Sequence, residues 1–481
     1  MVRVRPSAWA AMLLAAMAAP AWGLCARTCA RRPGGCARGF GTLAYVMSTC
    51  RVVGQAQVGS QELRVQRSGC DPVTVMRFED PTPVADPLGL CALVGRNHLG
   101  TASPIAGVFQ RLGVSETGKS VVFEVSNAFD LVEQPPLAPE EQGFFYVRSD
   151  GRGLRRLGPP SRDRTYRAFV SGGVPAATIT TRIAFAGDRR MAFTDLAPGP
   201  DGVETEQLFT MDLATAERRQ ATQLVAGTPP KPGRRIIEYF RFTRPRTIGF
   251  VHRQGDELDS ERVDIDGSGH VVDAAPPSPT GDGRVVPTIQ PTRLRYQIFN
   301  VAAPGLPVNA RELPDYGPND LFAEFNDHNF VQLTNYRYGD TALIGERPNA
   351  VLFETSADPV GENPFHNCQL FRISPHGLGL RQLTRFDQGR HSDEGCQIGP
   401  LAGCGINPVN ETPESDSSPA IAFYSDCDPL GTNPNGSQVF ALRWNGSGLR
   451  QLTNTRGVTT GPDGSVVEVE IPGPVARGGP R

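Results

Sequence analysis

The 481-residue sequence has little net charge and almost no lysine. Its 48 basic and 50 acidic side chains give a formal net charge of −2, and Lys119 and Lys231 are its two lysines. A chain without an excess of one sign produces no field that would attract nucleic acid or an anionic membrane. We therefore expect neither nucleic acid nor membrane insertion.

Apolar runs of about 20 residues, the length that spans a bilayer, are missing from the chain after its N-terminal segment. In that segment two arginines precede an apolar run over residues 9–19, and the small-residue pattern Ala21-Trp22-Gly23 follows. This order is typical of a secretory signal peptide. Cleavage after Gly23 would release a soluble periplasmic or extracellular protein. The alternative is a lipid anchor on Cys25, but the large Leu24 precedes it where such sites need a small residue.

All ten cysteines lie in the mature chain, and an even number in an exported protein favours disulfides. The segment from Cys396 to Cys404 contains glycine and proline that suit a tight reversal, so we predict a Cys396–Cys404 disulfide. Zinc is the competing interpretation for the cysteines near the N-terminus, but their spacing lacks the paired CxxC knuckles of structural zinc sites. The cysteines are at positions 25, 29, 36, 50, 70, 91, 368, 396, 404 and 427.

Helical periodicity is almost absent, whereas glycine (53) and proline (43) are abundant. Short β-branched and aromatic runs, such as residues 121–125, 183–186 and 248–251, are bounded by turn-forming residues. This pattern is typical of strands joined by hairpins. The sequence therefore predicts an all-β fold.

An internal repeat defines the architecture. Residues 351–384 and 421–453 share the pattern DPxGxNP, followed by Gly-x-Gly-Leu-Arg-Gln-Leu-Thr. Weaker copies extend the repeat backwards and give six units about 59 residues apart. Their turns are near residues 151, 214, 267, 328, 377 and 446. Several short strands repeated in this way predict a β-propeller, most simply a six-bladed one with four-stranded blades.

The half-unit that ends in Gly-Leu-Arg-Gln-Leu-Thr resembles the WD40-like (PD40-type) repeat of TolB-like β-propellers. The resemblance covers residues 101–460 and implies the propeller fold. It leaves residues 1–23 as the signal peptide, residues 24–100 as a small cysteine-rich N-terminal region, and residues 461–481 as a C-terminal strand or flexible tail.

Two segments imitate ligand-binding motifs. Residues 113–120 match the phosphate-loop pattern G-x4-G-K-[ST], but the strand-like residues 121–125 stand where that loop requires a helix. Residues 264–269 match the start of a calcium loop, but Ala275 occupies the position that should supply a carboxylate. We interpret both segments as hairpin turns and expect no cofactor.

The DPxGxNP loops carry the candidate partner-binding residues Asp358, Asn363, Asp428 and Asn433. Their oxygens could bind a cation or a partner's backbone. The simpler interpretation, which we favour, is that they cap their own turns while proline fixes the backbone.

Motifs for hydrolysis are missing: the sequence has neither a G-x-S-x-G elbow nor HExxH. His366, His376 and His391 are the histidines nearest one another and could form a metal site. The leading hypothesis is an exported, non-enzymatic, monomeric scaffold that binds another protein or an envelope polymer, without catalytic residues or a metal. The alternative is an extracellular carbohydrate-active enzyme, a metal-assisted polysaccharide lyase or hydrolase, on the same fold.

Overall fold

In the computed structural model of the chain, all regular secondary structure of the described residues is β-strand. The model describes residues 41–53, 56–79, 108–126, 137–162, 169–171, 174–176, 183–225, 236–254, 257–273, 295–300, 319–325, 329–334, 341–347, 350–355, 357–364, 369–386, 406–408, 420–425, 428–432, 438–463 and 466–478. Within these ranges there is no helix, and so none long and apolar enough to cross a membrane.

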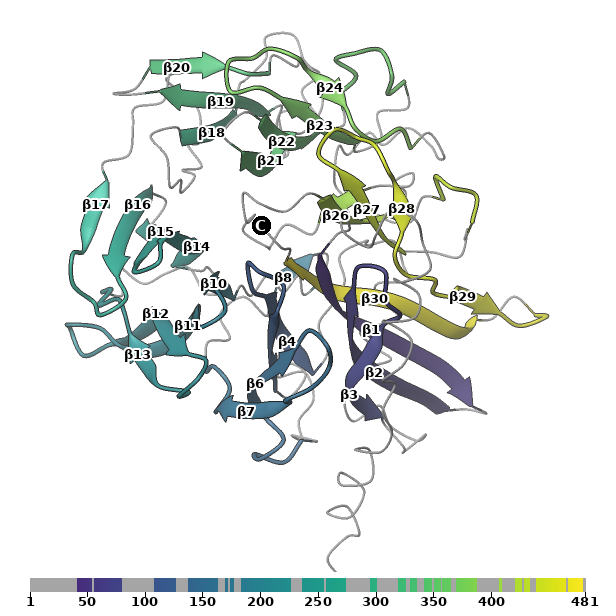
Figure 1. Cartoon of the computed structure of the whole chain (residues 1–481), viewed down its shortest axis with the longest axis horizontal. Coiled ribbons are helices and arrows are strands. Elements are labelled where there is room, and N and C mark those ends of the chain that lie inside the picture. The colour runs from purple at the N-terminus through teal and green to yellow at the C-terminus, as the bar shows by residue number, and fades with distance from the viewer. Residues whose placement is uncertain are drawn as a thin grey trace, which may run out of the picture.

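Six antiparallel sheets follow one another along the chain and form most of a ring (Figure 1). The first three have four strands each: β4 (Phe109–Val114), β5 (Ser120–Val125), β6 (Gly143–Arg148) and β7 (Arg155–Gly158); β10 (Ala184–Ala186), β11 (Arg190–Pro198), β12 (Glu204–Asp212) and β13 (Arg218–Gln220); β14 (Ile237–Arg244), β15 (Thr247–Gln254), β16 (Glu257–Asp264) and β17 (Val271–Asp273).

The other three sheets complete the repeats: β18 (Arg295–Asn300), β19 (Asn319–Phe325) and β20 (Asn329–Gln332); β21 (Thr341–Arg347), β22 (Ala350–Thr355), β23 (Gln369–Ile373) and β24 (Arg381–Gln382); β25 (Ile406–Pro408), β26 (Ala420–Ser425), β27 (Gln438–Arg443) and β28 (Arg450–Gln451). A small hairpin, β8 (Phe169–Ser171) and β9 (Val174–Ala176), lies between the first two sheets in the sequence. Each of the six expected turns falls between the last two strands of one sheet, so the six repeat units of the propeller are confirmed.

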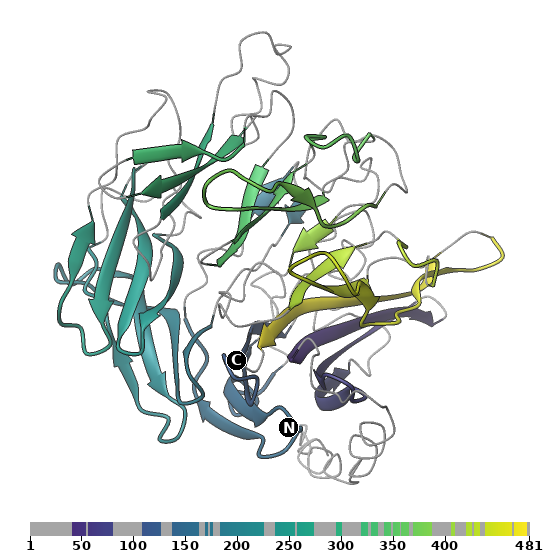
Figure 2. The same ribbon diagram turned by 45° about the horizontal axis from the view of Figure 1, so that its top comes forward.

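A further, five-stranded sheet joins the two ends of the chain. It contains β1 (Thr42–Val53), β2 (Ala56–Arg67), β3 (Val73–Glu79), β29 (Gly457–Thr460) and β30 (Val466–Gly478), in the order β29-β30-β1-β2-β3. β1 and β30 pair antiparallel, and the tilted view shows these purple and yellow strands side by side (Figure 2). Pairing the two ends gives each terminal strand a hydrogen-bonding partner and so protects edges that would otherwise be open.

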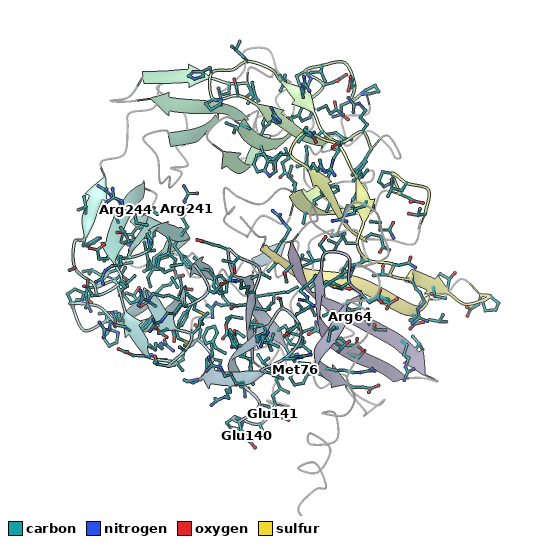
Figure 3. The ribbon with its side chains drawn as sticks, viewed as in Figure 1. Arg64, Met76, Glu140, Glu141, Arg241 and Arg244 are labelled. Carbon is teal, nitrogen blue, oxygen red and sulfur yellow. The ribbon has the colours of Figure 1, made fainter. Side chains whose placement is uncertain are left out.

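This sheet is packed between the first and last repeat sheets. Ala44 and Val46 share a buried cluster with Phe123 of β5, and Leu43 and Tyr45 share another with β26 and β27. The ring therefore extends beyond the expected limits of residues 101 and 460. It uses residues 42–79 and the C-terminal strand, while the cysteine-rich residues 24–40 lie outside the described ranges. Glu140 and Glu141 lie at the outer margin of the ring (Figure 3).

Stacked phenylalanines form the centre of four repeat sheets. In each pair, the residue on the second strand lies directly opposite its partner on the third, with ring centroids 5.5 to 6.0 Å apart. Such cross-strand aromatic pairs stabilise a sheet beyond the area they bury. The pairs are Phe123–Phe145, Phe193–Phe209, Phe353–Phe371 and Phe423–Phe440.

A buried glutamine and threonine explain the rest of the repeat pattern. In the β25–β28 sheet the Oε1 atom of Gln438 accepts a hydrogen bond from the Thr453 hydroxyl (3.0 Å), and the Thr453 oxygen accepts one from the Val439 amide (2.8 Å). Gln369 and Thr384 in the β21–β24 sheet, and Gln207 and Thr222 in the β10–β13 sheet, make the same contacts. The Gln before the phenylalanine and the Thr of Leu-Thr thus join the third strand to the segment that follows the fourth.

Candidate functional site

The DPxGxNP loops cap their own turns. Asp358 Oδ1 accepts a hydrogen bond from the Asn363 amide (2.8 Å), and Asn363 Nδ2 donates to the Ala357 carbonyl oxygen (3.1 Å). In the next sheet, Asp428 Oδ1 accepts one from the Thr432 amide (2.8 Å). These are the backbone contacts of the simpler interpretation. The partner-binding role of these residues stays a prediction.

Several residues singled out in the sequence lie outside the part of the chain that the structure describes. They are Cys396, Cys404, Asn433, His366 and His391. The predicted disulfide and the histidine metal site therefore stay predictions.

The segment that resembles a phosphate loop is a β-hairpin. β4 ends at Val114 and β5 begins at Ser120, with Gly118 between them at a φ of 72°. The Gly118 carbonyl oxygen accepts a hydrogen bond from the Thr42 hydroxyl of β1 (2.7 Å), so this turn packs on the sheet that joins the chain ends. A strand follows the glycines where phosphate binding needs a helix N-terminus, which confirms the hairpin interpretation.

The segment that resembles a calcium loop is the turn between β16 and β17. Asp266 Oδ1 accepts hydrogen bonds from the amide (3.0 Å) and hydroxyl (2.6 Å) of Ser268, and Asp264 Oδ1 accepts one from the Thr247 hydroxyl (2.7 Å). The carboxylates are thus used within the hairpins, as the turn interpretation requires.

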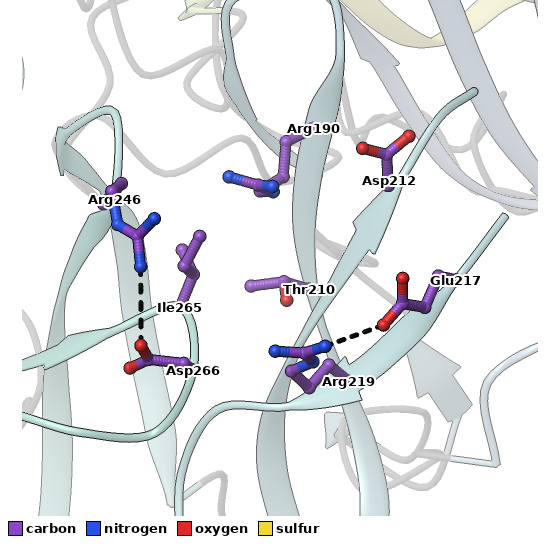
Figure 4. Close-up of a pocket in the computed structure, with 8 residues that line it drawn as sticks. All are labelled: Arg190, Thr210, Asp212, Glu217, Arg219, Arg246, Ile265 and Asp266. Carbon is purple, nitrogen blue, oxygen red and sulfur yellow. Dashed lines mark hydrogen bonds and ion pairs between the residues drawn. The ribbon is translucent and has the colours of Figure 1, made fainter. Parts of the chain in front are cut away.

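A polar pocket of about 190 Å³ lies between the β10–β13 and β14–β17 sheets (Figure 4). It is formed by the turns that join the first strand to the second and the third strand to the fourth in both sheets. We call this side of the ring the hairpin face. Four of the lining residues lie on β11, β12 and β13, and the others lie on or beside the turns. They are Arg190, Thr210, Asp212, Glu217, Arg219, Arg246, Ile265 and Asp266.

Two of the three arginines in the pocket are paired within it. Arg219 contacts Glu217 at 2.8 Å, and Arg246 contacts Asp266 at 3.4 Å (Figure 4). Hydrogen bonds from Ser268 lower the pKa of Asp266. Asp266 is therefore ionised near neutral pH and offsets the charge of Arg246.

The third acid of the pocket, Asp212, accepts hydrogen bonds within its own turn. Its Oδ1 atom accepts hydrogen bonds from the amides of Ala214 (2.8 Å) and Thr215 (3.2 Å), and its Oδ2 atom accepts one from Arg189 Nε (3.0 Å). Burial acts to raise the pKa of Asp212, but these bonds outweigh it, and the pKa is lowered. Arg190 lies directly across the strand pair from Asp212. Its guanidinium has no hydrogen-bond or ion-pair partner among the residues that the structure describes.

A buried acid interrupts the aromatic pattern in the β14–β17 sheet. Glu261 lies opposite Phe250, at the position that phenylalanine holds in four other sheets, and its side chain is 1% exposed. Its carboxylate contacts His252 Nδ1 at 2.8 Å and His270 Nε2 at 2.6 Å. Burial acts to raise the pKa of Glu261, but the hydrogen bonds to the two histidines outweigh it and lower the pKa. The His270 ring stacks on Phe250 in place of the missing aromatic partner.

The sequence carried a signal for Glu261. Phenylalanine stands six residues before the turn glycines Gly377 and Gly446, and counting back six residues from Gly267 gives Glu261. The charged pocket had no such signal, because its residues come from strands and turns of two sheets, outside the repeated Phe and Gln-to-Thr positions.

Comparison with solved structures finds distant likenesses. The chain is similar to a prolyl endopeptidase, with 11% identity, a TM-score of 0.41, and coverage of 88% of this chain and 52% of that one. It is similar to TolB from Acinetobacter baumannii, with 10% identity, a TM-score of 0.34, and coverage of 84% of this chain and 81% of that one. It is also similar to oligopeptidase B from Leishmania major, with 9% identity, a TM-score of 0.40, and coverage of 89% of this chain and 53% of that one. The successive antiparallel sheets arranged around a ring make the fold a β-propeller.

The chain spans about half the length of the two peptidases. No family model matches the chain, and no curated protein matches it. At these identities the likeness concerns the fold alone, and the assignment rests on the sheets and their order.

Proposed function

We propose that the chain is an exported, non-enzymatic β-propeller that binds another protein or an envelope polymer through its hairpin face. The observation that carries this proposal is the pocket, to which the hairpins of two neighbouring sheets contribute six charged side chains. Loops positioned by a rigid scaffold are where binding residues are usually found.

The chemistry of the pocket supports binding. Its lining consists of three arginines, three acids, Thr210 and Ile265. Guanidinium groups keep their charge at all physiological pH values, so they hold anionic partners and do not act as proton donors or nucleophiles.

The exposed arginines of the hairpin face give the proposal a direct test. The Arg246 side chain is 70% exposed and contacts Asp266, so reversing its charge changes the face without disturbing a buried group. Arg77 is a matched control: its side chain is 51% exposed and contacts Glu62 and Glu79 in the sheet that joins the chain ends, which contains neither the pocket nor a DPxGxNP loop.

The experiment is cross-linking and affinity capture of the mature protein in its producing cells, comparing wild type with Arg246→Glu and Arg77→Glu. We expect a partner whose recovery falls at least severalfold in Arg246→Glu and is unchanged in Arg77→Glu. Equal recovery with both variants, or no specific partner, would contradict binding by this face.

Export belongs to the same proposal and is supported by the N-terminal 23 residues. The intact mass of the secreted protein should correspond to a chain that begins at Leu24 without lipid. An acylated N-terminus at Cys25 would place the protein on a membrane instead.

A further inference from the structure

The pocket on the hairpin face contains one arginine that has no carboxylate partner among the described residues. Three arginines and three acids line it, but Asp212 is already neutralised by Arg189, which lies outside the lining. With Arg189 counted, four guanidinium groups face three carboxylates. The surplus is at Arg190, because the other arginines contact Asp212, Glu217 and Asp266.

The position of Arg190 suits an incoming anion. It is the first residue of β11, it is half-buried, and its guanidinium lies in the pocket (Figure 4). A planar guanidinium presents a fork of N–H donors that matches a carboxylate, and such charge-assisted pairs are among the stronger hydrogen bonds. The hydroxyl of Thr210 lies on the same wall.

The size and polarity of the pocket limit what enters it. A volume of about 190 Å³ is below the range of roughly 300 to 1,000 Å³ that is usual for sites of small organic ligands. Such sites are also mostly apolar, whereas Ile265 is the one apolar side chain among the described residues of this lining. A single acidic side chain fits better, with its methylene groups against Ile265 and its carboxylate on Arg190.

We propose that this pocket binds the carboxylate of an acidic side chain in a partner protein, and that Arg190 is the residue that holds it. The inference rests on the proposed function and specifies the chemistry that the partner must present. Because the whole chain has a net charge of −2, its overall charge would not attract an acidic peptide, and binding would depend on the local surplus.

Fluorescein-labelled hexaglutamate is the probe, and its anisotropy with the mature protein is the measurement. Hexaglutamine supplies the same backbone without carboxylates, and unlabelled polygalacturonate supplies carboxylates on a sugar chain. Arg190→Gln removes the proposed fork, and Arg190→Lys keeps the charge without the fork. Arg456→Gln is the control, because Arg456 is a 64% exposed arginine whose partners Glu468 and Glu470 lie on β30.

We expect hexaglutamate to bind the wild type, Arg190→Gln to weaken binding about tenfold, and Arg190→Lys to give an intermediate affinity. Arg456→Gln should bind as the wild type does. The inference is overturned if the wild type does not bind hexaglutamate, if Arg190→Gln binds it equally well, or if hexaglutamine binds as tightly. Competition by polygalacturonate that equals that of unlabelled hexaglutamate would assign the site to a polymer.

The two proposals fail separately. A captured cellular partner that is lost in Arg246→Glu but retained in Arg190→Gln would leave the binding function intact and overturn the role of Arg190. Binding of hexaglutamate that depends on Arg190, without any captured cellular partner, would support the role of Arg190 and contradict the proposed binding function.

Discussion

Glutamine in place of Glu261 should destabilise the propeller measurably at neutral pH. Glu261 is buried and accepts hydrogen bonds from both His252 and His270. A glutamine side chain has one acceptor oxygen and no charge, so the second histidine could keep a hydrogen bond only by changing its tautomer and accepting from the amide group. A hydrogen bond to a charged group contributes about 1.5 to 3 kcal/mol, and relief from burying a charge offsets part of the loss. We expect a cost of about 2 kcal/mol in the free energy of unfolding.

The pH dependence has a defined sign. The pKa of Glu261 is lower in the folded protein than its ordinary value near 4.5. Its contribution to stability is therefore fully present above about pH 4.5 and is lost as the pH falls through the folded pKa. The difference between wild type and Glu261→Gln should therefore shrink as the pH falls through the folded pKa of Glu261.

Urea unfolding of the mature protein measures this difference. Of the three tryptophans, Trp9 and Trp22 fall in the expected signal peptide, so buried Trp444, directly after β27, should provide the fluorescence signal of the mature protein. Glu79→Gln is the control, since Glu79 is 47% exposed and pairs with Arg77 at the surface, where such pairs contribute little. Equal stability of wild type and Glu261→Gln at neutral pH, or a difference that does not shrink in acid, would refute the reasoning.

Three further predictions concern the hairpins, the repeat and the buried ion pair. Lys119→Ala should change stability by at most about 0.5 kcal/mol, and calorimetry with ATP and Mg²⁺ should show no binding, because Lys119 is in a β-hairpin. Thr453→Val should cost about 1 to 3 kcal/mol in urea unfolding by leaving a buried amide unsatisfied, whereas Thr459→Val at an exposed position should be neutral. Glu124 of β5 and Arg111 of β4 form an ion pair whose side chains are at most 1% exposed. Glu124→Ala should lower the free energy of unfolding by about 3 to 5 kcal/mol, because it leaves the Arg111 charge buried without its carboxylate partner. A loss below about 1 kcal/mol in urea unfolding would contradict this.

The repeat sheets could be predicted because their signals are local. Turn residues and the Phe and Gln-to-Thr spacings recur within each unit, and they correspond to contacts inside one sheet. The closing sheet could not be predicted in the same way. Its central pairing joins Thr42 to Gly478, and neither strand carries the repeat pattern that marks the other sheets.

The candidate site could not be predicted as the repeat sheets could, because it depends on contacts between residues of two sheets. The charge surplus at Arg190 depends on Asp212 being occupied by two backbone amides and Arg189, and on β14–β17 hairpins that bring Arg246 and Asp266 to the other wall. No single repeat unit contains this arrangement. The departure that a repeat alignment does reveal, Glu261, belongs to the same β14–β17 sheet, and its partner His270 directly follows the turn that carries Asp266. The β14–β17 sheet thus carries both this departure from the repeat and one wall of the pocket, which makes its boundary with the β10–β13 sheet the part of the ring where function is best sought.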